Sequence, residues 1–300
     1  MSIYLGGVVK PAAFDYRVPA SLEEALALLA EHGDEARVLA GGQSLMPMLN
    51  MRLSRPSVIV DLNRIDELRT TLVGERSLTV GSMIRQREAE LDPAFRQRLP
   101  VLGDALKRVG HVTTRNRGTI GGSICHADPA AELPALAVFL DATLTVRSQR
   151  GVRTIPAAQF YKGVFSTALE PDELLTDVAF PFLERGCGAA VCEFTRRSHE
   201  FAIAGVYAAL TRNSADVVTS CRLLAFGVNG EISRLTTAEN TLMGQIYRTE
   251  LVDEAAAVAR SSLSALSDTV ASSAYRLELV RALCARALTT AYERGVPTDE

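Results

Sequence analysis

The chain has 300 residues, of which 47% are hydrophobic and 22% are charged. A chain of this length and composition can bury a substantial core, and its length favours about two domains. The formal net charge is −3 and the sequence pI is near 5.9, so neither a nucleic-acid backbone nor an anionic membrane surface is an expected partner. The longest nearly unbroken apolar stretch, residues 133–140, is far shorter than the roughly 18 residues that span a bilayer.

The first residues, Met1 to Gly7, lack the basic start, the apolar run and the cleavage site of a secretory signal. We therefore expect a cytoplasmic chain without membrane insertion. The cysteines form no CxxC pair and no Cys/His cluster, which argues against a zinc or iron–sulfur site in this chain and favours free, mostly buried thiols. They are Cys125, Cys187, Cys192, Cys221 and Cys284.

The first half of the chain reads as mixed helix and strand. A helix is predicted from Leu22, because Ser21 and Glu24 form a capping box and Gly33 is a typical helix end. Short buried strands are expected at 36–40 and 58–62, and a hairpin is expected to pair 70–73 with 78–81. Helical spacing follows over 83–91 and 94–109, with a break at Pro100.

Further along, a helix is expected over 129–140 and strands at 143–147 and 174–180. Residues 181–188 form the candidate linker, because long strands (191–197, 203–212 and 217–229) and two amphipathic helices (250–261 and 273–294) follow. We predict an α+β chain with one domain over residues 1–180, divided into subdomains of about 1–57 and 58–180. A second domain is predicted over residues 187–300.

Two glycine loops are the strongest chemical signal. Ala40-Gly41-Gly42-Gln43-Ser44 follows a predicted strand, and Thr119-Ile120-Gly121-Gly122-Ser123 lies in a second connection of the same domain. Adjacent glycines let backbone amides approach an anion closely, although one such loop alone is more often a tight turn. Two loops together can hold a pyrophosphate from both sides. Neither fits the P-loop or the GxGxxG pattern, which disfavours a mononucleotide hydrolase and a Rossmann dehydrogenase.

These loops and their surroundings resemble a known family, the FAD-binding medium subunits of molybdenum hydroxylases such as the carbon monoxide and xanthine dehydrogenases. The resemblance covers most of the chain in order, and the last hundred residues match by pattern more than by motif. The matching segments are 39–47, 81–83, 119–134, 169–175 and 196–202. The resemblance implies a two-part FAD-binding domain of the PCMH (vanillyl-alcohol oxidase-like) type. A smaller C-terminal α+β domain, with an antiparallel sheet and helices, would follow it.

The resemblance also implies a set of cofactor-binding residues. The two glycine loops would hold the FAD pyrophosphate, Glu132 would face the adenosine part, and Val109, Leu169 and Phe201 would lie against or near the isoalloxazine ring. Glu132 and Phe201 depart from the family pattern, in which aspartate, and tyrosine or an aliphatic residue, are usual. The full set is Ala40, Gly41, Gly42, Gln43, Ser44, Val109, Thr119, Ile120, Gly121, Gly122, Ser123, His126, Glu132, Leu169 and Phe201.

Several of these residues have a structural alternative. Glu132 also fits a first-turn carboxylate that is favoured by a helix dipole. Asp128, which precedes a proline, is best explained as a helix N-cap. His126 fits either a ligand of the FAD phosphates or a structural histidine. Arg196 and Arg197 fit either a solvated pair or a pair beside the flavin.

The resemblance implies noncovalent FAD and neither catalytic residues nor a metal site in this chain. A large partner subunit would carry the molybdenum cofactor, and a small one would relay electrons through two [2Fe–2S] clusters to the FAD. The FAD would pass them to an external acceptor, in a complex that is a dimer of heterotrimers. The alternatives are a self-sufficient FAD-dependent oxidoreductase and a non-enzymatic FAD-binding scaffold. Substrate choice would belong to the large subunit.

Overall fold

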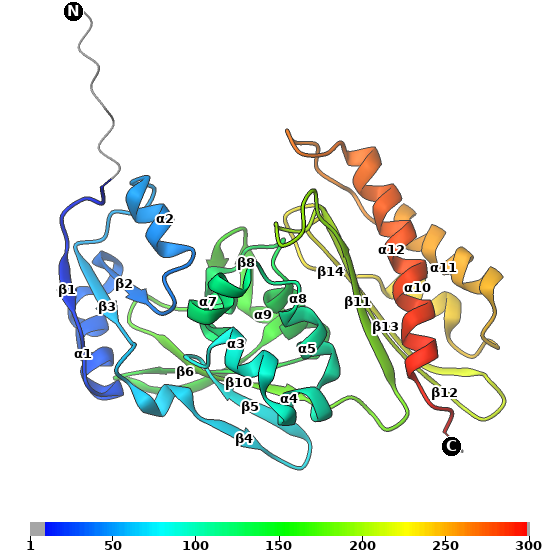
Figure 1. Ribbon diagram of the computed structural model, residues 1–300, viewed down its shortest axis with the longest axis horizontal. Coiled ribbons are helices and arrows are strands. Elements are labelled where there is room, and N and C mark those ends of the chain that lie inside the picture. Colours follow the sequence, from blue (N-terminus) through cyan, green and yellow to red (C-terminus); the bar gives the residue numbers. More distant parts are fainter. Residues whose placement is uncertain (1–9, 299–300) are drawn as a thin grey trace, which may run out of the picture.

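The computed structural model describes residues 10–298. Residues Met1 to Gly7, on which the expectation about a leader rests, lie outside this range. Within it, no helix combines the length and the apolar character that crossing a bilayer requires. Three parts follow one another along the chain, each built around its own sheet (Figure 1).

The first part is a parallel sheet in the order β1-β3-β2. Its strands are β1 (Asp15–Arg17), β2 (Ala36–Leu39) and β3 (Val58–Asp61). Helix α1 (Leu22–His32) begins as predicted, with the Ser21 hydroxyl accepting a hydrogen bond from the backbone N–H of Glu24 (3.2 Å), and Gly33 ends it. Because β3 is the central strand, the first sheet extends beyond residue 57. The subdomain boundary that the sequence placed there is therefore too early.

The second part is an antiparallel sheet in the order β4-β5-β10-β6-β7. The predicted hairpin is confirmed, and a two-stranded hairpin of β8 and β9 lies beside the sheet. The strands are β4 (Thr71–Val73), β5 (Ser77–Gly81), β6 (Thr143–Ser148), β7 (Gly151–Pro156), β8 (Tyr161–Gly163), β9 (Ser166–Thr167) and β10 (Leu174–Pro181).

Helices cover one face of this sheet and bury the largest apolar cluster against it (Figure 1). Pro100 begins a new helix, as predicted, because proline is tolerated in a first helical turn. The helices are α3 (Gln86–Leu91), α4 (Pro93–Arg98), α5 (Pro100–Leu106), α6 (Val112–Arg117), α7 (Ile120–His126), α8 (Glu132–Phe139) and α9 (Ala157–Phe160).

Two predictions in this part need correction. The second glycine segment is not a loop between elements, since Gly121 and Gly122 lie in the first turn of α7 and only 118–119 separate α7 from α6. Asp128 does not cap α8 either. Its carboxylate accepts a hydrogen bond from the N–H of Ala130 (2.9 Å) and closes a turn, and α8 begins at Glu132.

The third part is an antiparallel sheet in the order β11-β12-β13-β14, with helices packed on its outer face (Figure 1). The three long strands and the two long helices are confirmed. The strands are β11 (Gly188–Phe194), β12 (Ala204–Arg212), β13 (Val218–Phe226) and β14 (Ser233–Arg234), and the helices are α10 (Thr236–Leu242), α11 (Thr249–Ser261) and α12 (Ser273–Arg294).

The inner face of this sheet packs on the second part. Tyr207 of β12 is fully buried, and its ring stacks on Phe139 of α8 with the ring centroids 5.1 Å apart. Its hydroxyl donates a hydrogen bond to the carbonyl of Glu132 (3.0 Å). The five cysteines are free, three of them buried and two half-buried, as the sequence predicted.

Candidate functional site

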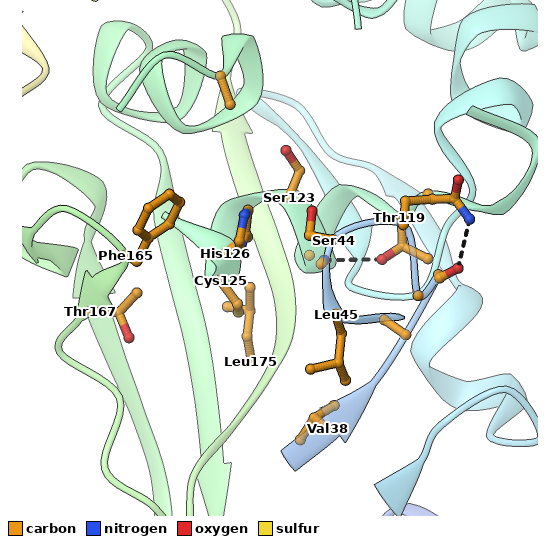
Figure 2. Close-up of a pocket in the computed structure, with 18 of the residues that line it drawn as sticks. Val38, Ser44, Leu45, Thr119, Ser123, Cys125, His126, Phe165, Thr167 and Leu175 are labelled. Atoms are coloured by element: carbon orange, nitrogen blue, oxygen red, sulfur yellow. Dashed lines mark hydrogen bonds between the residues drawn. The ribbon is translucent and has the colours of Figure 1, made fainter. Parts of the chain in front are cut away.

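A large cavity lies where the three parts meet. Its volume of about 1030 Å³ is at the upper end of the roughly 300–1,000 Å³ typical of small-molecule sites. Every predicted cofactor-binding residue lines it except Ile120, which is fully buried in the core of the second part. Figure 2 shows Ser44 of the first glycine segment near Thr119 and Ser123 of the second. The cavity thus brings together segments that are far apart in the sequence.

The first glycine segment joins β2 to helix α2 (Leu45–Asn50). Gly42 has a φ of +74°, a conformation that favours glycine. Within residues 10–298, the backbone N–H groups of Gly42, Gln43, Ser44 and Leu45 donate no hydrogen bond. Unpaired amides at a cavity wall are well suited to an anionic group.

The second glycine segment begins α7. The Thr119 hydroxyl accepts a hydrogen bond from the N–H of Gly122 (3.0 Å) and caps the helix. A Cβ on Gly121 would overlap the side chain of Ser82, and a Cβ on Gly41 would lie 2.8 Å from the Cα of Gly118. These two glycines are therefore needed for the close packing of chain segments on one another, a reason that the sequence did not indicate.

Two polar residues of the cavity wall were missed by sequence reasoning. Ser82 and Gln86 are 5% and 4% exposed, and both line the cavity. Among the described residues, the Ser82 hydroxyl and the Gln86 carbonyl oxygen have no hydrogen-bond partner. Buried polar atoms without partners are costly, so a polar ligand in the cavity would satisfy them. The sequence signal for Ser82 was its place in segment 81–83, which matches the family, whereas Gln86 gave no signal.

Comparison with known proteins identifies the family of the chain. The model of the FAD binding domain in molybdopterin dehydrogenase matches residues 12–183, and that of the CO dehydrogenase flavoprotein C-terminal domain matches residues 189–291. The chain belongs to the flavoprotein subunits of the molybdenum hydroxylases. It is accordingly an oxidoreductase component that contains an FAD-binding domain.

Relatives of this flavoprotein align along nearly their whole length. The chain is 38% identical to the 6-hydroxypseudooxynicotine dehydrogenase complex subunit alpha of Paenarthrobacter nicotinovorans, covering 97% of this chain and 99% of that one. A carbon monoxide dehydrogenase structure from Hydrogenophaga pseudoflava superimposes with a TM-score of 0.91 at 33% identity, covering 95% and 99% of the two chains. Quinoline 2-oxidoreductase from Pseudomonas putida 86 gives a TM-score of 0.91 at 35% identity, covering 95% and 98%.

In this flavoprotein, Val109 is held from behind by a buried ion pair. Arg115 is 4% exposed, and its guanidinium donates hydrogen bonds to the carbonyls of Val109 (2.9 Å) and Gly110 (2.6 Å). The same guanidinium pairs with the carboxylate of Glu90 at 2.8 Å. Burial alone would raise the pKa of Glu90, but the hydrogen bonds from Arg115 and Arg87 and the charges of these two arginines together lower it. The cavity wall at Val109 therefore rests on a rigid polar support.

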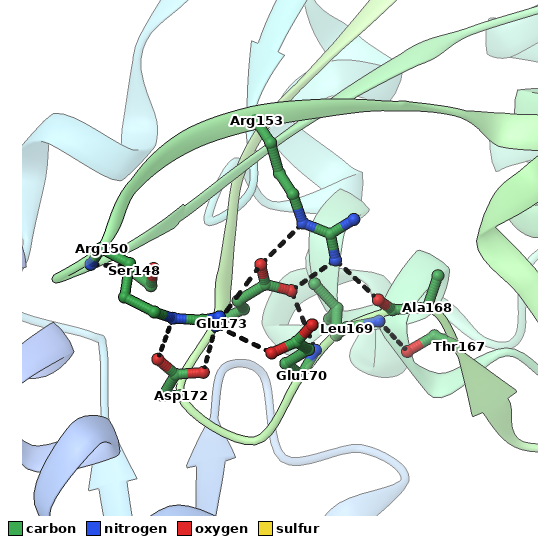
Figure 3. Close-up of polar contacts among 9 residues, drawn as sticks. All are labelled: Ser148, Arg150, Arg153, Thr167, Ala168, Leu169, Glu170, Asp172 and Glu173. Carbon is green, nitrogen blue, oxygen red and sulfur yellow. Dashed lines mark hydrogen bonds and ion pairs between the residues drawn. The ribbon is translucent and has the colours of Figure 1, made fainter.

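Leu169 lies on the turn between β9 and β10, which a second ion pair holds (Figure 3). Arg153 donates hydrogen bonds to both carboxylate oxygens of Glu173, 2.7 Å each, and to the carbonyl of Ala168 (2.8 Å). The Glu173 carboxylate also accepts from the N–H of Glu170 (2.9 Å). The hydrogen bonds from Arg153 are the main cause of a lowered pKa of Glu173.

Glu132 is 5% exposed and occupies the first turn of α8. Burial raises its pKa to about 8, with a further contribution from the nearby carboxyl of Glu193. The guanidinium of Arg108, 4.0 Å from Glu193, lowers the pKa values of both carboxyls without cancelling the rise. At neutral pH the Glu132 side chain is therefore mostly protonated and able to donate a hydrogen bond into the cavity.

The remaining predicted residues differ in burial. His126 ends α7, is half-buried, and lies against the ring of Phe165 with the ring centroids 5.0 Å apart (Figure 2). Burial lowers the pKa of His126, which keeps the imidazole neutral at pH 7. Phe201 lies on the connection between β11 and β12, and it is 60% exposed although it lines the cavity.

The arginine pair on the same connection is solvated. Arg196 and Arg197 both approach the carboxylate of Glu200, at 3.6 and 3.8 Å, and their side chains are 62% and 78% exposed. Only Arg196 of the two lines the cavity. The ring of His199, which also lines it, lies 5.0 Å from that of His111.

Proposed function

We propose that this chain is the electron outlet of a heterotrimeric molybdenum hydroxylase. A large subunit with the molybdenum cofactor would hydroxylate the substrate, and a small subunit with two [2Fe–2S] clusters would deliver the electrons to this chain. Bound FAD supplies the chemistry here, because a flavin accepts electrons singly and releases them as a pair. We further propose a cytoplasmic dimer of heterotrimers with an external electron acceptor.

The observation that carries this proposal is the cavity itself. It is lined by both glycine segments, and the first of them presents backbone N–H groups that donate to no residue within 10–298. We propose that these amides, with the Ser44 and Ser123 hydroxyls, hold the FAD pyrophosphate. Oriented backbone N–H dipoles stabilise negative charge.

The other predicted residues take their roles from the same cavity. We propose that Glu132 donates or accepts hydrogen bonds with the adenosine part, and that Val109, Leu169 and Phe201 pack against or near the isoalloxazine ring. His126, neutral at pH 7, is proposed as a hydrogen-bond partner of the FAD phosphates. This chain needs no acid–base group of its own for substrate chemistry, since the proposal assigns hydroxylation to the large subunit.

The test is to express the chain with and without the genes for its partners and to identify acid-released flavin by chromatography. We expect about one FAD per chain, with iron and molybdenum present only when the partners co-purify. A folded, assembled preparation without flavin would refute the proposal. Substrate turnover by the isolated chain would instead support the self-sufficient flavoenzyme.

A further inference from the structure

The two glycine segments are connected by a buried arginine as well as by direct packing. Arg85, which precedes α3, is only 8% exposed. Its guanidinium donates one hydrogen bond to the carbonyl of Arg117 and another to the side-chain oxygen of Asn63. The Asn63 amide in turn donates to the carbonyl of Ala40 (3.0 Å). A series of hydrogen bonds therefore runs from Ala40 through the side chains of Asn63 and Arg85 to Arg117. Ala40 comes just before the first glycine pair, and Arg117 comes just before Gly118.

Arg85 and Asn63 form a bridge between the two glycine segments, and each of them is itself held in place. The N–H of Asn63 donates to the carboxylate of Asp61 at the end of β3 (2.8 Å), and its carbonyl accepts from the guanidinium of Arg69 (3.2 Å). The N–H of Arg85 donates to the carboxylate of Glu88 (3.1 Å). Groups fixed in this way lose little further conformational entropy when they position something else.

The backbone around Arg85 is also paired with the second glycine segment. Gln86 donates its N–H to the carbonyl of Gly118 (2.9 Å), and Ile120 donates to the carbonyl of Ile84 (3.0 Å). The second segment therefore rests on residues 82–86, and Arg117 and Gly118, which come just before it, pack against Gly41. Asn63 connects this arrangement to β3, the central strand of the first sheet, through its hydrogen bond to Asp61.

Three arginines, Arg85, Arg69 and Arg117, lie around this bridge against two carboxylates, Glu88 and Asp61. Both acceptors of the Arg85 guanidinium are uncharged oxygens. Burial lowers the pKa of Arg85, the positive charges of Arg69 and Arg117 lower it further, and the carboxylates of Glu88 and Asp61 oppose this shift without cancelling it. Among the described residues, the buried Nε of Arg69 has no hydrogen-bond partner. A dianionic group between the two glycine segments would offset this charge.

We propose that Arg85 and Asn63 are positioning residues for the diphosphate of the cofactor. They hold the two glycine segments at a fixed separation, and the local excess of arginine charge over carboxylate charge attracts the diphosphate. The inference rests on the proposed function, FAD binding in this cavity, and goes beyond it by assigning two residues outside both glycine segments.

The experiment uses the full chain, freed of flavin and titrated with FAD, and ADP serves as a competing probe that carries only the diphosphate end. The variants are Arg85→Met, Arg85→Lys, Asn63→Ala and the double variant Arg85→Met/Asn63→Ala. Arg260→Met is the control, because Arg260 pairs with Glu278 on the C-terminal helices and neither residue lines the cavity. Thermal unfolding of each flavin-free variant reports whether it folds.

For Arg85→Met we expect FAD and ADP to bind about tenfold more weakly or worse, and the salt dependence of binding to flatten. Arg85→Lys keeps the charge but cannot reach both acceptors, so it should retain the salt dependence and recover only part of the affinity. The double variant should bind about as weakly as Arg85→Met, because both changes break one bridge. If Arg85→Met does not fold, Arg85→Lys and Asn63→Ala decide the matter.

A purely structural arginine would give a different pattern, in which Arg85→Met loses stability and affinity while the salt dependence of FAD binding stays at the wild-type value. FAD and ADP affinities within about twofold of wild type in Arg85→Lys and Asn63→Ala would overturn the inference. If the wild-type chain bound no FAD, the proposed function itself would be refuted. The wild-type titration therefore distinguishes a failure of the proposed function from a failure of the positioning role.

Discussion

The carboxylate of Glu173 accepts two hydrogen bonds from the guanidinium of Arg153, each 2.7 Å long. The Glu173 side chain is only 5% exposed, whereas that of Arg153 is 45% exposed, so the carboxylate depends on this one partner for much of its stabilisation. The same guanidinium holds the carbonyl of Ala168. The pair therefore fixes both ends of the turn that carries Leu169 into the cavity wall.

Replacing Arg153 with Met should leave the Glu173 carboxylate buried and short of donors. We expect a loss of about 1–2 kcal/mol in the free energy of unfolding at pH 7, measured with urea. The lowered pKa of Glu173 contributes stability above the unfolded value of about 4.3, which is lost as the pH falls through the folded value. The difference in the free energy of unfolding between the variant and the wild type should thus become smaller below about pH 4. Arg260→Met, which removes an exposed pair with Glu278, is the control, and an equal loss there would contradict the argument.

Gly41→Ala should separate cofactor retention from general stability. The added Cβ would overlap the Arg117 carbonyl and push the two glycine segments apart, costing about 1–3 kcal/mol and most of the bound FAD. Gly33→Ala is the matched control, because Gly33 has a φ of +48° but open space around it. It should cost about 1–2 kcal/mol and leave the FAD content intact. Equal flavin content in both purified variants would rule out this explanation.

Glu132→Gln should remove a pH dependence from the flavin-free chain. Since folding raises the pKa of Glu132 from 4.5 to about 8, the wild type should lose stability as the pH rises through that window. The variant cannot ionise there, so its urea midpoint should change less between pH 5 and pH 8.5. Glu250→Gln, at an exposed position, should behave as wild type. A wild-type midpoint that rises over this range would contradict the assignment.

Phe201→Ser tests whether an exposed aromatic at the cavity belongs to the cofactor. Because the side chain is 60% exposed, its loss should change the stability of the flavin-free chain by no more than about 0.5 kcal/mol. Binding of FAD should weaken by about twofold to tenfold, followed by flavin fluorescence, as expected for one lost aromatic contact. Phe194→Ser, at 39% exposure and outside the cavity lining, is the comparison. Identical FAD affinities in the two variants would argue against the role.

The elements predicted correctly are those whose signals are local. Ser21 and Gly33 mark both ends of α1 by capping, and the long buried strand β12 has an unmistakable apolar run. Strand β7 was missed because only Ile155 among its residues is buried, which leaves no alternating pattern to detect. Helix α2 was missed because Pro47 reads as a breaker, although it lies in the first turn, where no hydrogen bond from its nitrogen is needed.

The site was predictable where a motif carries it and not where tertiary contacts do. The glycine pairs were recognised from sequence, and the cavity gathers both of them. The second pair was misplaced in a loop, because glycine in the first turn of a helix looks the same in sequence as glycine in a turn. Arg85 and Arg115 gave no signal, since their partners Asn63 and Glu90 are more than twenty positions away and meet them only after folding.

The meeting of three sheets at one cavity has a consequence for how the chain comes apart. A ligand that touches all three parts stabilises each of them only while the others stay in place, so binding energy is converted into cooperativity between the parts. The flavin-free chain should then open in stages, whereas the loaded chain should open in a single transition. Flavin content would in that case report the integrity of the whole molecule, including the C-terminal helices, whose residues do not line the cavity.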